Sequence, residues 1–591
     1  MDASVAQRQS LARLDVERLG TRLRKLRPMS AGAILPARRV PRLVLISLIS
    51  LTTMGLSALA GCSRTQAEPP RLVLLIVVDQ LRGDVFERYG ERLDGDGLRL
   101  LVDHGVHYRE AHFRHGITNT APGHVTIVSG AHPAVHGIVG NNWLDPETNR
   151  IVYCVEDPRH RLLKEPTEVR DGVSPGLVTV ETLGDVMVGH GDGVSRAFGV
   201  SLKDRGAILL AGRAGKAFWY SRRSGRFVTS DYYYPGEPRW LAEFNAAQPA
   251  EAYRRTPWRL LRDDRDYRFI DRDDQPWERD FKGLGRVFPH DLAASSDYHA
   301  ALRFTPYADE LTLAAVAALI EAESIGAGPG PDLLGISLSA TDYVGHAFGP
   351  DSLEAEDNLF RLDRTISALL ALIDKRVGLE RTLVILTSDH GIPSAPEFLA
   401  LRGDPVARID TPAMVARLNA ALRAEFGLDY DPVLRFLNPT LFLDVRRLQA
   451  DDKDIGQVER TLVRFALREP GIQSAFASRD LVAGVDADSG ERALARASIQ
   501  PGRSGQVYLV QSPGWHLHPV PQQQAAMHGS PHRYDTHVPI VIMGPGLEPQ
   551  VVIRPVGVES LAASVAAYLG LRAPAQASGA LLPELILSQE R

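Results

Sequence analysis

Four short groups of carboxylate and imidazole residues stand out in this sequence because each lies beside an apolar run. Aspartate and histidine side chains supply the oxygen and nitrogen ligands that hold divalent ions such as zinc. A pair of zinc ions needs about seven ligands, with a position left open for a substrate. The four groups, which together predict a two-metal hydrolytic centre, are Asp79, Asp342-Tyr343-Val344-Gly345-His346, Asp389-His390-Gly391 and His528-Gly529-Ser530, the last with His532 and His537 nearby.

Each residue taken alone has an ordinary structural explanation. Asp79 or Asp342 would suit the cap of a following helix, and a single histidine commonly has a structural or surface role. The adjacent pair Asp389-His390 is more specific, because neighbouring residues at a strand end point in different directions and can serve two ions. The joint occurrence of all four groups in one chain favours catalysis over coincidence.

A candidate nucleophile lies in the segment Gly116-Ile-Thr-Asn-Thr120-Ala-Pro122-Gly123-His124. A hydroxyl held by a metal ion is partly deprotonated and attacks without a separate histidine base. Thr120 precedes a turn at Pro122-Gly123 that leads into a helix-like run, and a helix N-terminus favours a nearby anion. The alternatives are that Thr120 only caps this helix, or that Thr118 is the nucleophile.

The apolar runs beside these groups predict the elements that position them. Runs of this length are typical of strands buried on both faces, as in a parallel sheet. The predicted strands are Leu72–Val78, Leu333–Leu338, Thr382–Leu386 and Val538–Met543, and helical spacing predicts helices over Glu310–Glu323, Glu354–Val377 and Glu559–Leu569. This alternation predicts an α/β fold with a doubly wound, mostly parallel sheet flanked by helices, whose chemistry lies beyond the carboxyl ends of strands.

Two long stretches interrupt the alternation of strands and helices. Residues 211–300 are rich in Arg, Asp, Trp and Tyr, and residues 395–520 delay the last predicted strand. We expect both to be insertions that cap the active-site face. The catalytic core then consists of residues 71–210, 301–394 and 521–575, followed by a tail at 576–591.

Residues 1–62 have the pattern of a secretory signal, with Met29 as an alternative start. Basic residues at 38, 39 and 42 precede 18 uncharged residues, and Leu59-Ala60-Gly61-Cys62 then resembles the bacterial lipobox, whose cysteine is lipidated. A transmembrane anchor is the alternative, because 18 apolar residues just span a bilayer. We expect a lipid anchor at Cys62 as the only membrane attachment, a linker at 63–70, and a periplasmic or cell-surface location.

The composition excludes some other classes of protein. The 591 residues carry a formal net charge of −5, so no basic surface for a nucleic-acid partner is expected. The chain has two cysteines, Cys62 and Cys154. If Cys62 is lipidated, Cys154 has no partner, and a disulfide framework is not expected.

The ordered set of motifs resembles the alkaline phosphatase superfamily over about residues 70–575. Its type I phosphodiesterase/nucleotide pyrophosphatase branch is most similar, because Pro133-Ala-Val-His-Gly137-Ile-Val-Gly-Asn141-Asn142 matches that branch. The resemblance implies two zinc ions. One is held by Asp79, Asp389, His390 and the Thr120 oxygen, and the other by Asp342, His346 and His528, with His532 and His537 as alternatives to His528.

The resemblance also implies the groups that contact the substrate. An asparagine 21 residues after the nucleophile donates to a phosphoryl oxygen, which points to Asn141, with Asn142 as the alternative. Ser201-Leu-Lys203-Asp204-Arg205-Gly206 resembles the Lys-x-Arg pair of threonine-type alkaline phosphatases. On the residues alone, Lys203 and Arg205 would be a solvated pair beside Asp204, although alternation along an extended segment lets both face one side.

The Lys-x-Arg pair bears on the expected substrate, because a phosphate monoester carries one more negative charge than a diester. The resemblance therefore implies a secreted alkaline phosphatase that hydrolyses small-molecule phosphate monoesters through a phosphothreonine intermediate. The alternative is a nucleotide pyrophosphatase/phosphodiesterase on the same two-metal core.

Overall fold

The computed structural model describes residues 69–165, 172–190, 194–437, 439–484 and 490–590. The predicted signal segment, Cys62 and most of the predicted linker lie outside these residues. Within the described part of the chain, no helix is both long and apolar enough to cross a membrane. Cys154 is buried and forms no disulfide there.

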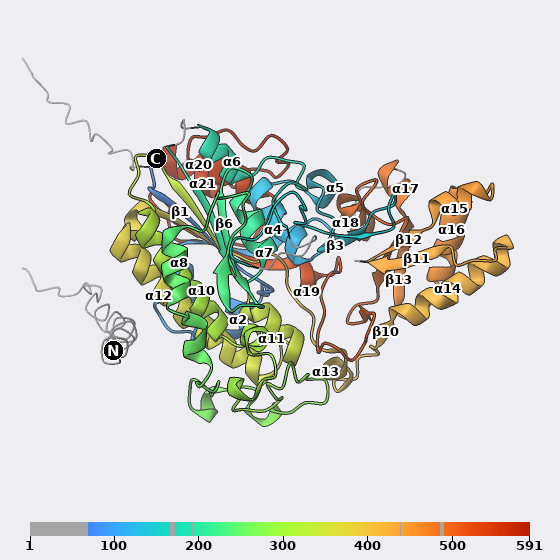
Figure 1. Ribbon diagram of the computed structural model, residues 1–591, viewed down its shortest axis with the longest axis horizontal. Coiled ribbons are helices and arrows are strands. Elements are labelled where there is room, and N and C mark those ends of the chain that lie inside the picture. The colour runs from blue at the N-terminus through green and yellow to red at the C-terminus, as the bar shows by residue number, and fades with distance from the viewer. Residues whose placement is uncertain (1–68, 166–171, 191–193, 438, 485–489, 591) are drawn as a thin grey trace, which may run out of the picture. The chain divides into compact units, whose positions relative to one another are not determined.

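A ten-stranded mixed sheet forms the centre of the described chain (Figure 1), in the order β17-β2-β16-β9-β1-β8-β5-β6-β7, with β18 beside β2. The neighbours β9, β1, β8, β5 and β6 are all parallel. The strands are β1 (Leu72–Val78), β2 (Val106–His112), β5 (Ala197–Ser201), β6 (Lys216–Ser221), β7 (Arg226–Val228), β8 (Asp332–Leu338), β9 (Thr382–Thr387), β16 (His537–Met543), β17 (Gln550–Val552) and β18 (Val556–Gly557). The mostly parallel α/β sheet predicted from the sequence is thus confirmed.

Strand β16 differs from the expectation, because it runs antiparallel to both of its neighbours, β9 and β2. It starts at His537, at the edge of the sheet where the parallel strands end. A continuous apolar run indicates burial on both faces but carries no information on strand direction. The predicted strand is therefore present with the opposite orientation.

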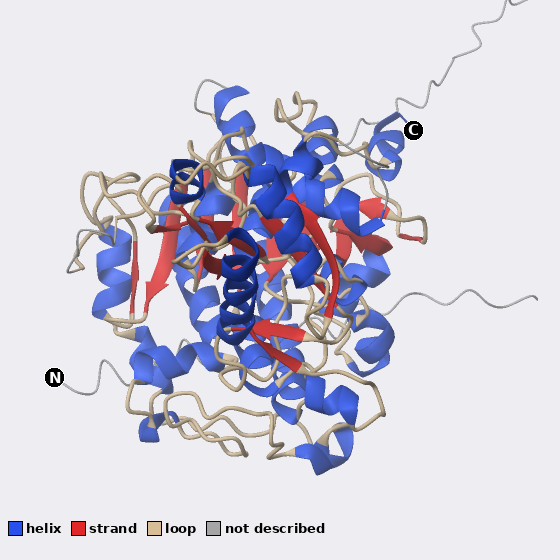
Figure 2. Cartoon of the chain, turned by 90° about the vertical axis from the view of Figure 1, so that its right-hand side faces the viewer, coloured by secondary structure: helices blue, strands red, loops and turns tan. Residues whose placement is uncertain are grey.

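Helices cover both faces of the sheet (Figure 2). Successive side chains of β1 point to opposite faces and all are apolar, so both faces must be covered. Leu72, Leu74 and Ile76 pack in one core with α10 (Tyr307–Glu323), α11 (Ala340–Phe348) and α12 (Leu353–Arg376). Val73, Leu75 and Val77 pack on the other face with α4 (Thr120–Ser129), α6 (Leu183–His190) and α20 (Ser560–Tyr568). Helices α10, α12 and α20 correspond to the three predicted helices.

The two expected insertions differ in how they relate to the sheet. Residues 211–300 begin with β6 and β7, which extend the main sheet, so the segment outside the sheet starts only after Val228. The apolar run of β6 is only four residues long (217–220) and lies among charged residues, so it was not predicted as a strand. Residues 395–520 contain a second, four-stranded sheet with its own apolar core, seen in orange in Figure 1. Its elements are β11 (Val433–Leu437), β12 (Thr440–Leu443), β13 (Ile472–Ala477), β14 (Val507–Gln511), α14 (Thr411–Phe426) and α16 (Ile455–Ala466).

Candidate active site

Three neighbouring parallel strands bring the three aspartates to one edge of the sheet. Asp79 follows β1 directly, Asp389 follows β9 by two residues, and Asp342 lies in the first turn of α11 after β8. Because β9, β1 and β8 are in register and parallel, their carboxyl ends meet at the same place. All three carboxylates are buried.

Asp79, Asp389 and His390 form the first group of candidate metal ligands, with one ligand atom from each within 4.8 Å of the others. His390 Nε2 lies 3.5 Å from Asp79 Oδ1 and 3.6 Å from Asp389 Oδ2. Asp79 Oδ1 and His390 Nε2 are buried without a hydrogen-bond partner, and the buried oxygens Asp79 Oδ2 and Asp389 Oδ2 have only ion-pair contacts, with Lys203 and His124. Convergent buried polar atoms without partners fit a bound cation.

Asp342, His390 and His528 form a second group on the same criterion. Asp342 Oδ1 lies 3.2 Å from His346 Nε2 and 3.5 Å from His528 Nε2. The rings of His390 and His528 are stacked with centroids 3.6 Å apart, so the two groups adjoin. The structure therefore brings together all six side chains that the sequence analysis assigned as metal ligands besides Thr120.

The three histidines are oriented alike, with Nδ1 on a backbone carbonyl. His346 Nδ1 lies 2.9 Å from the Ala526 oxygen, His390 Nδ1 is 3.0 Å from the Gly391 oxygen, and His528 Nδ1 is 2.8 Å from the Thr118 oxygen. When Nδ1–H donates to a carbonyl, Nε2 keeps its lone pair for a metal ion. The donor set therefore fits divalent ions such as zinc.

The site contains more carboxylates than positively charged side chains, which favours the binding of additional cations. Lys203 Nζ lies 2.5 Å from Asp79 Oδ2 and 2.5 Å from Asp342 Oδ2, and it is the one ammonium set against three buried carboxylates. Burial lowers the pKa of Lys203, but Asp342 and Asp79 outweigh it and raise that pKa above its usual value. Burial, together with repulsion from Asp342 and Asp389, raises the pKa of Asp79 well above its ordinary value. Divalent cations would relieve this repulsion.

Thr120 is the first residue of α4, and its neighbours in that helix touch the first metal group. His124 Nδ1 lies 2.8 Å from the Thr120 carbonyl oxygen and 3.2 Å from Asp389 Oδ2. Gly123 approaches the Asp389 backbone so closely that a Cβ there would lie 2.1 Å from its carbonyl oxygen. Thr118 has a different role, because its hydroxyl donates to the Ser530 carbonyl oxygen over 2.9 Å.

Asn141 lies beside the start of this helix, where its Oδ1 accepts the Ala121 N–H over 3.0 Å. This contact leaves the Asn141 Nδ2 group as a donor for a ligand at the helix N-terminus. Asn142, the alternative, is the first residue of the β3 hairpin strand (Asn142–Leu144). The geometry favours Asn141 for contact with a ligand beside Thr120.

Lys203 and Arg205 do not alternate along an extended segment as expected. Lys203 is extended, but Arg205 lies in the first turn of α7 (Asp204–Ala211), because Asp204 begins the helix. Arg205 Nη1 lies 3.4 Å from the Tyr153 hydroxyl, and its Nε is buried without a hydrogen-bond partner. No carboxylate of the described residues lies within 4.0 Å of the Arg205 guanidinium.

Two further residues that the sequence analysis missed hold the ligands in place. Gln80 donates from its backbone to Asp389 Oδ1 over 3.1 Å and from its side chain to Asp342 Oδ1 over 2.8 Å. It does so with a φ of 71°, which is strained for a residue other than glycine. Its position directly after Asp79 was the only signal in the sequence.

Asp535 connects the loops of two histidine ligands. Its Oδ2 accepts from Gly529 N at 3.1 Å, Ser530 N at 2.8 Å and Ser530 Oγ at 2.6 Å, while its backbone oxygen accepts from Gly391 N at 2.8 Å. Gly529 follows His528 and Gly391 follows His390. Nothing in the sequence pattern pointed to this aspartate, which lies in the short helix α19 (Arg533–Thr536).

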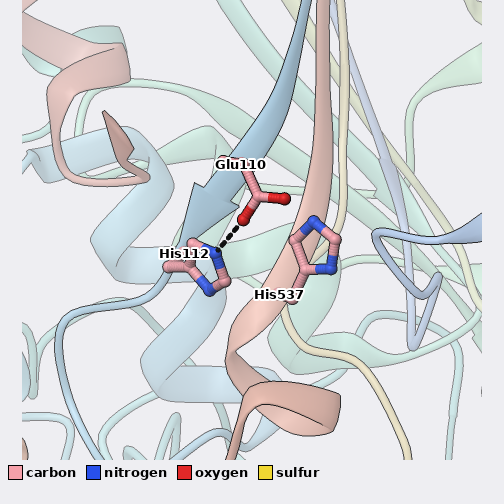
Figure 3. A group of neighbouring side chains, drawn as sticks. All are labelled: Glu110, His112 and His537. Atoms are coloured by element: carbon pink, nitrogen blue, oxygen red, sulfur yellow. Dashed lines mark hydrogen bonds and ion pairs between the residues drawn. The ribbon is translucent and has the colours of Figure 1, made fainter. Parts of the chain in front are cut away.

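The two alternatives to His528 lie elsewhere. His532 Nε2 lies 2.7 Å from the Gln511 carbonyl oxygen. His537 stacks on His112 with ring centroids 4.8 Å apart, beside Glu110, as Figure 3 shows. This group could hold a metal ion by composition. However, Arg533 already binds both Glu110 oxygens at 2.8 and 3.0 Å, and His537 Nε2 is 2.7 Å from the Arg109 oxygen.

Comparison with known proteins places this arrangement among phosphoryl-transfer enzymes. A family model described as type I phosphodiesterase / nucleotide pyrophosphatase matches residues 73–532. Alkaline phosphatase PhoV of Synechococcus elongatus is 30% identical over 525 residues, covering 88% of this chain and 93% of that protein. Alkaline phosphatase PafA of Elizabethkingia meningoseptica is 30% identical over 549 residues, covering 91% and 98%.

The crystal structure of wild-type PafA superimposes with a TM-score of 0.83 at 29% identity, covering 88% of this chain and 99% of PafA. A second PafA structure carries replacements of a threonine, an asparagine, a lysine and an arginine. The intervals between these four positions are 21, 62 and 2 residues. Thr120, Asn141, Lys203 and Arg205 follow one another at the same intervals.

Proposed function

This chain belongs to the type I phosphodiesterase / nucleotide pyrophosphatase family, and on that premise we propose that it is an alkaline phosphatase that hydrolyses phosphate monoesters with Thr120 as nucleophile. The observation that carries the proposal is Arg205. Its guanidinium lacks a carboxylate partner among the described residues and has a buried N–H without an acceptor, next to Lys203 and the clustered ligands. A phosphoryl dianion supplies the missing acceptor oxygens.

The residues that would hold two zinc ions are those assigned from the sequence. Asp79, Asp389, His390 and the Thr120 oxygen would hold one, and Asp342, His346 and His528 the other. The buried atoms without partners and the common orientation of the histidines support this assignment. When bound, such a pair of ions supplies Lewis acidity that polarises a phosphoryl group and activates a hydroxyl.

The residues of the chain then bind and orient the substrate. Asn141 lies at the N-terminus of α4, where the helix dipole also favours a phosphoryl oxygen, while Lys203 contacts Asp79 and Asp342 and Arg205 contacts Tyr153. Lys203 Nζ lies 2.5 Å from carboxylate oxygens of both Asp79 and Asp342, which positions a basic group beside the proposed ligands. Three donors and a helix end match the additional charge of a monoester better than a neutral pocket would.

The proposed reaction proceeds in two displacements at phosphorus. Thr120 Oγ1 forms a bond to phosphorus while the bond to the leaving-group oxygen breaks, which releases an alcohol or phenol and leaves a phosphothreonine. Water then attacks phosphorus, the bond to Thr120 Oγ1 breaks, and inorganic phosphate leaves. The three intervals shared with the replaced PafA residues support Thr120, Asn141, Lys203 and Arg205 as the participants.

The proposal is tested by comparing kcat/KM for p-nitrophenyl phosphate and bis-p-nitrophenyl phosphate on zinc-loaded protein. We expect a strong monoester preference that collapses in Lys203→Ala/Arg205→Ala, because the diester carries less charge for these cations to hold. Arg239→Ala/Arg265→Ala is a matched control, since these arginines are 91% and 83% exposed. A diester preference that the Lys203/Arg205 variant leaves unchanged would favour a phosphodiesterase instead.

We also propose that the protein is exported and held by a lipid at Cys62, in the periplasm or on the cell surface. The support is the sequence alone: a basic segment, an uncharged run and the ending Leu59-Ala60-Gly61-Cys62. Mass spectrometry of the purified N-terminal peptide tests this directly. We expect a diacylglyceryl cysteine in the native protein and a soluble, active enzyme from Cys62→Ser; an unprocessed N-terminus would contradict the lipid anchor.

A further inference from the structure

A second arginine, Arg303, contacts the same aromatic ring as Lys203, one of the proposed phosphoryl-binding cations. Tyr343 directly follows the ligand Asp342 in α11. Lys203 Nζ lies 5.1 Å from the centre of the Tyr343 ring, and the Arg303 guanidinium carbon lies 4.8 Å from the same centre. The two cations are thus no further apart than the sum of these distances.

The position of Arg303 is fixed by the same tyrosine. Arg303 Nη1 donates to the Tyr343 hydroxyl over 2.9 Å, and the adjacent Phe304 ring packs edge-on against Tyr343 with centroids 5.1 Å apart. The Lys203 side chain is only 1% exposed, whereas Tyr343 and Arg303 are both half-buried. A line from Lys203 across the tyrosine to Arg303 therefore leads from the buried site toward solvent.

Arg303 lacks the kind of ion pair that several other arginines of the described chain have. Arg254 lies 2.6 Å from Glu251, Arg262 is 3.1 Å from Asp94, and Arg361 is 2.8 Å from Asp357. Within the described chain, no carboxylate oxygen comes within 4.0 Å of Arg303. Apart from Tyr343, its only hydrogen bond is a long one of 3.4 Å from Nε to the Ala300 oxygen.

A half-buried guanidinium without a carboxylate, oriented by a tyrosine, has donors left for an anionic ligand. Because Lys203 and Arg303 contact one ring, a single small substrate bound at the phosphoryl site is able to reach both cations. We infer that Arg303 and Tyr343 form a subsite for a second negatively charged group, a carboxylate or a phosphate, on the leaving-group part of the substrate. This inference rests on the proposed phosphomonoesterase function and adds a preference for substrates that carry a second anion.

The test compares three substrates in the zinc-loaded full-length protein: phenyl phosphate, 4-carboxyphenyl phosphate and 1,4-phenylene bisphosphate. Each variant is compared with the unmodified enzyme on the same substrate, so differences in leaving-group reactivity cancel. For Arg303→Ala we expect kcat/KM to fall about 10-fold or more on the two substrates with a second anionic group, mostly through KM, and to change less than about two-fold on phenyl phosphate. Comparison of these two substrates separates a carboxylate preference from a phosphate preference.

Three controls distinguish a binding role from a structural one. Arg303→Lys should restore part of the preference, because it keeps the charge but loses the fork of donors. Tyr343→Phe should reduce the preference, because it removes the hydroxyl that orients Arg303. Arg254→Ala, which removes an ion-paired arginine of the same region, should leave all three substrates unaffected.

Equal losses on all three substrates, or no loss on any, would overturn the inference. Failure of the unmodified enzyme to hydrolyse phenyl phosphate would instead contradict the proposed function. In that case calorimetric binding of phenylphosphonate and 4-phosphonobenzoate still decides the matter. We expect tighter binding of the carboxylated compound, and loss of that difference in Arg303→Ala; equal binding of both compounds would refute the subsite.

Discussion

Replacing Asp535 by alanine should weaken one of the two proposed metal sites more than the other. The Asp535 carboxylate accepts three hydrogen bonds from Gly529 and Ser530, which follow the ligand His528. Its backbone oxygen, which alanine keeps, accepts from Gly391, which follows the ligand His390. The substitution therefore releases the His528 loop and leaves the His390 loop tethered.

The size of the effect follows from the groups left without an acceptor. The half-buried Gly529 N–H and the buried Ser530 N–H and hydroxyl lose their acceptor, at roughly 1–3 kcal/mol for each buried unsatisfied group. The loss of residues that orient a ligand typically weakens metal binding about 10–100-fold. We therefore expect a loss in this range for the ion held by Asp342, His346 and His528, and a smaller one for the other ion.

Stepwise removal of zinc by a chelator, followed by metal analysis and by kcat, measures this difference. The assay is best run at pH 9, because burial raises the pKa of Asp535 to about 8 and the carboxylate is then ionised. Asp535→Asn keeps one acceptor oxygen and should lie between the alanine variant and the unmodified protein. Ser530→Ala removes only the hydroxyl bond and should cost least. Release of both ions in one step, or unchanged zinc affinity, would refute this account of Asp535.

Three further predictions follow from the geometry. Gly123→Ala should reduce kcat by more than about 100-fold, because the new Cβ would lie 2.1 Å from the Asp389 oxygen, whereas Gly90→Ala meets nothing within 4 Å and should be neutral in the same assay. Burial raises the pKa of Asp309 to about 7, so the native state keeps a proton that the unfolded chain loses near pH 4. The stability that this group contributes should therefore fall as the pH rises from about 4 to 7. Chemical denaturation at several pH values should show a flatter pH profile of stability for Asp309→Asn. His537→Ala should leave zinc stoichiometry unchanged, because His537 stacks on His112 beside Glu110 (Figure 3) and is not one of the proposed zinc ligands. Loss of zinc in this variant would restore His537 as a candidate ligand.

Much of the fold was predictable because its signals are local. The apolar run Leu72–Val78 coincides with β1, and the helical pattern over Glu354–Val377 coincides with α12 to within one residue at either end. Strand direction was not predictable, because β16 is buried on both faces whichever way it runs. The short strand Lys216–Ser221 was missed since its apolar run lies at the start of a charged segment.

The candidate site likewise contains residues that the sequence could predict and residues that it could not. Asp79, Asp342 and Asp389 follow strands that pair in register, so a motif at each strand end was enough to bring the three together. Asp535 and Thr118 act through contacts that depend on how two distant loops pack, such as the 2.8 Å contact between Thr118 O and His528 Nδ1. No spacing in the sequence encodes such contacts, so Asp535 was missed, and Thr118 was considered only as an alternative nucleophile and not for its contact with His528.

Thr118 links the proposed nucleophile to the proposed metal site across the chain. Its carbonyl oxygen orients His528 and its hydroxyl binds the Ser530 carbonyl, while Thr120 begins α4 only two residues later. The segment that carries His528 comes after the separate sheet of residues 395–520, so this sheet lies between two parts of one site along the chain. The sheet also contacts both parts through its strand β14, because the Tyr508 hydroxyl donates to the Gly116 carbonyl oxygen over 2.8 Å and the Gln511 carbonyl oxygen lies 2.7 Å from His532 Nε2. Thr118 and Asp535 therefore act together with β14 in holding the returning segment beside the nucleophile.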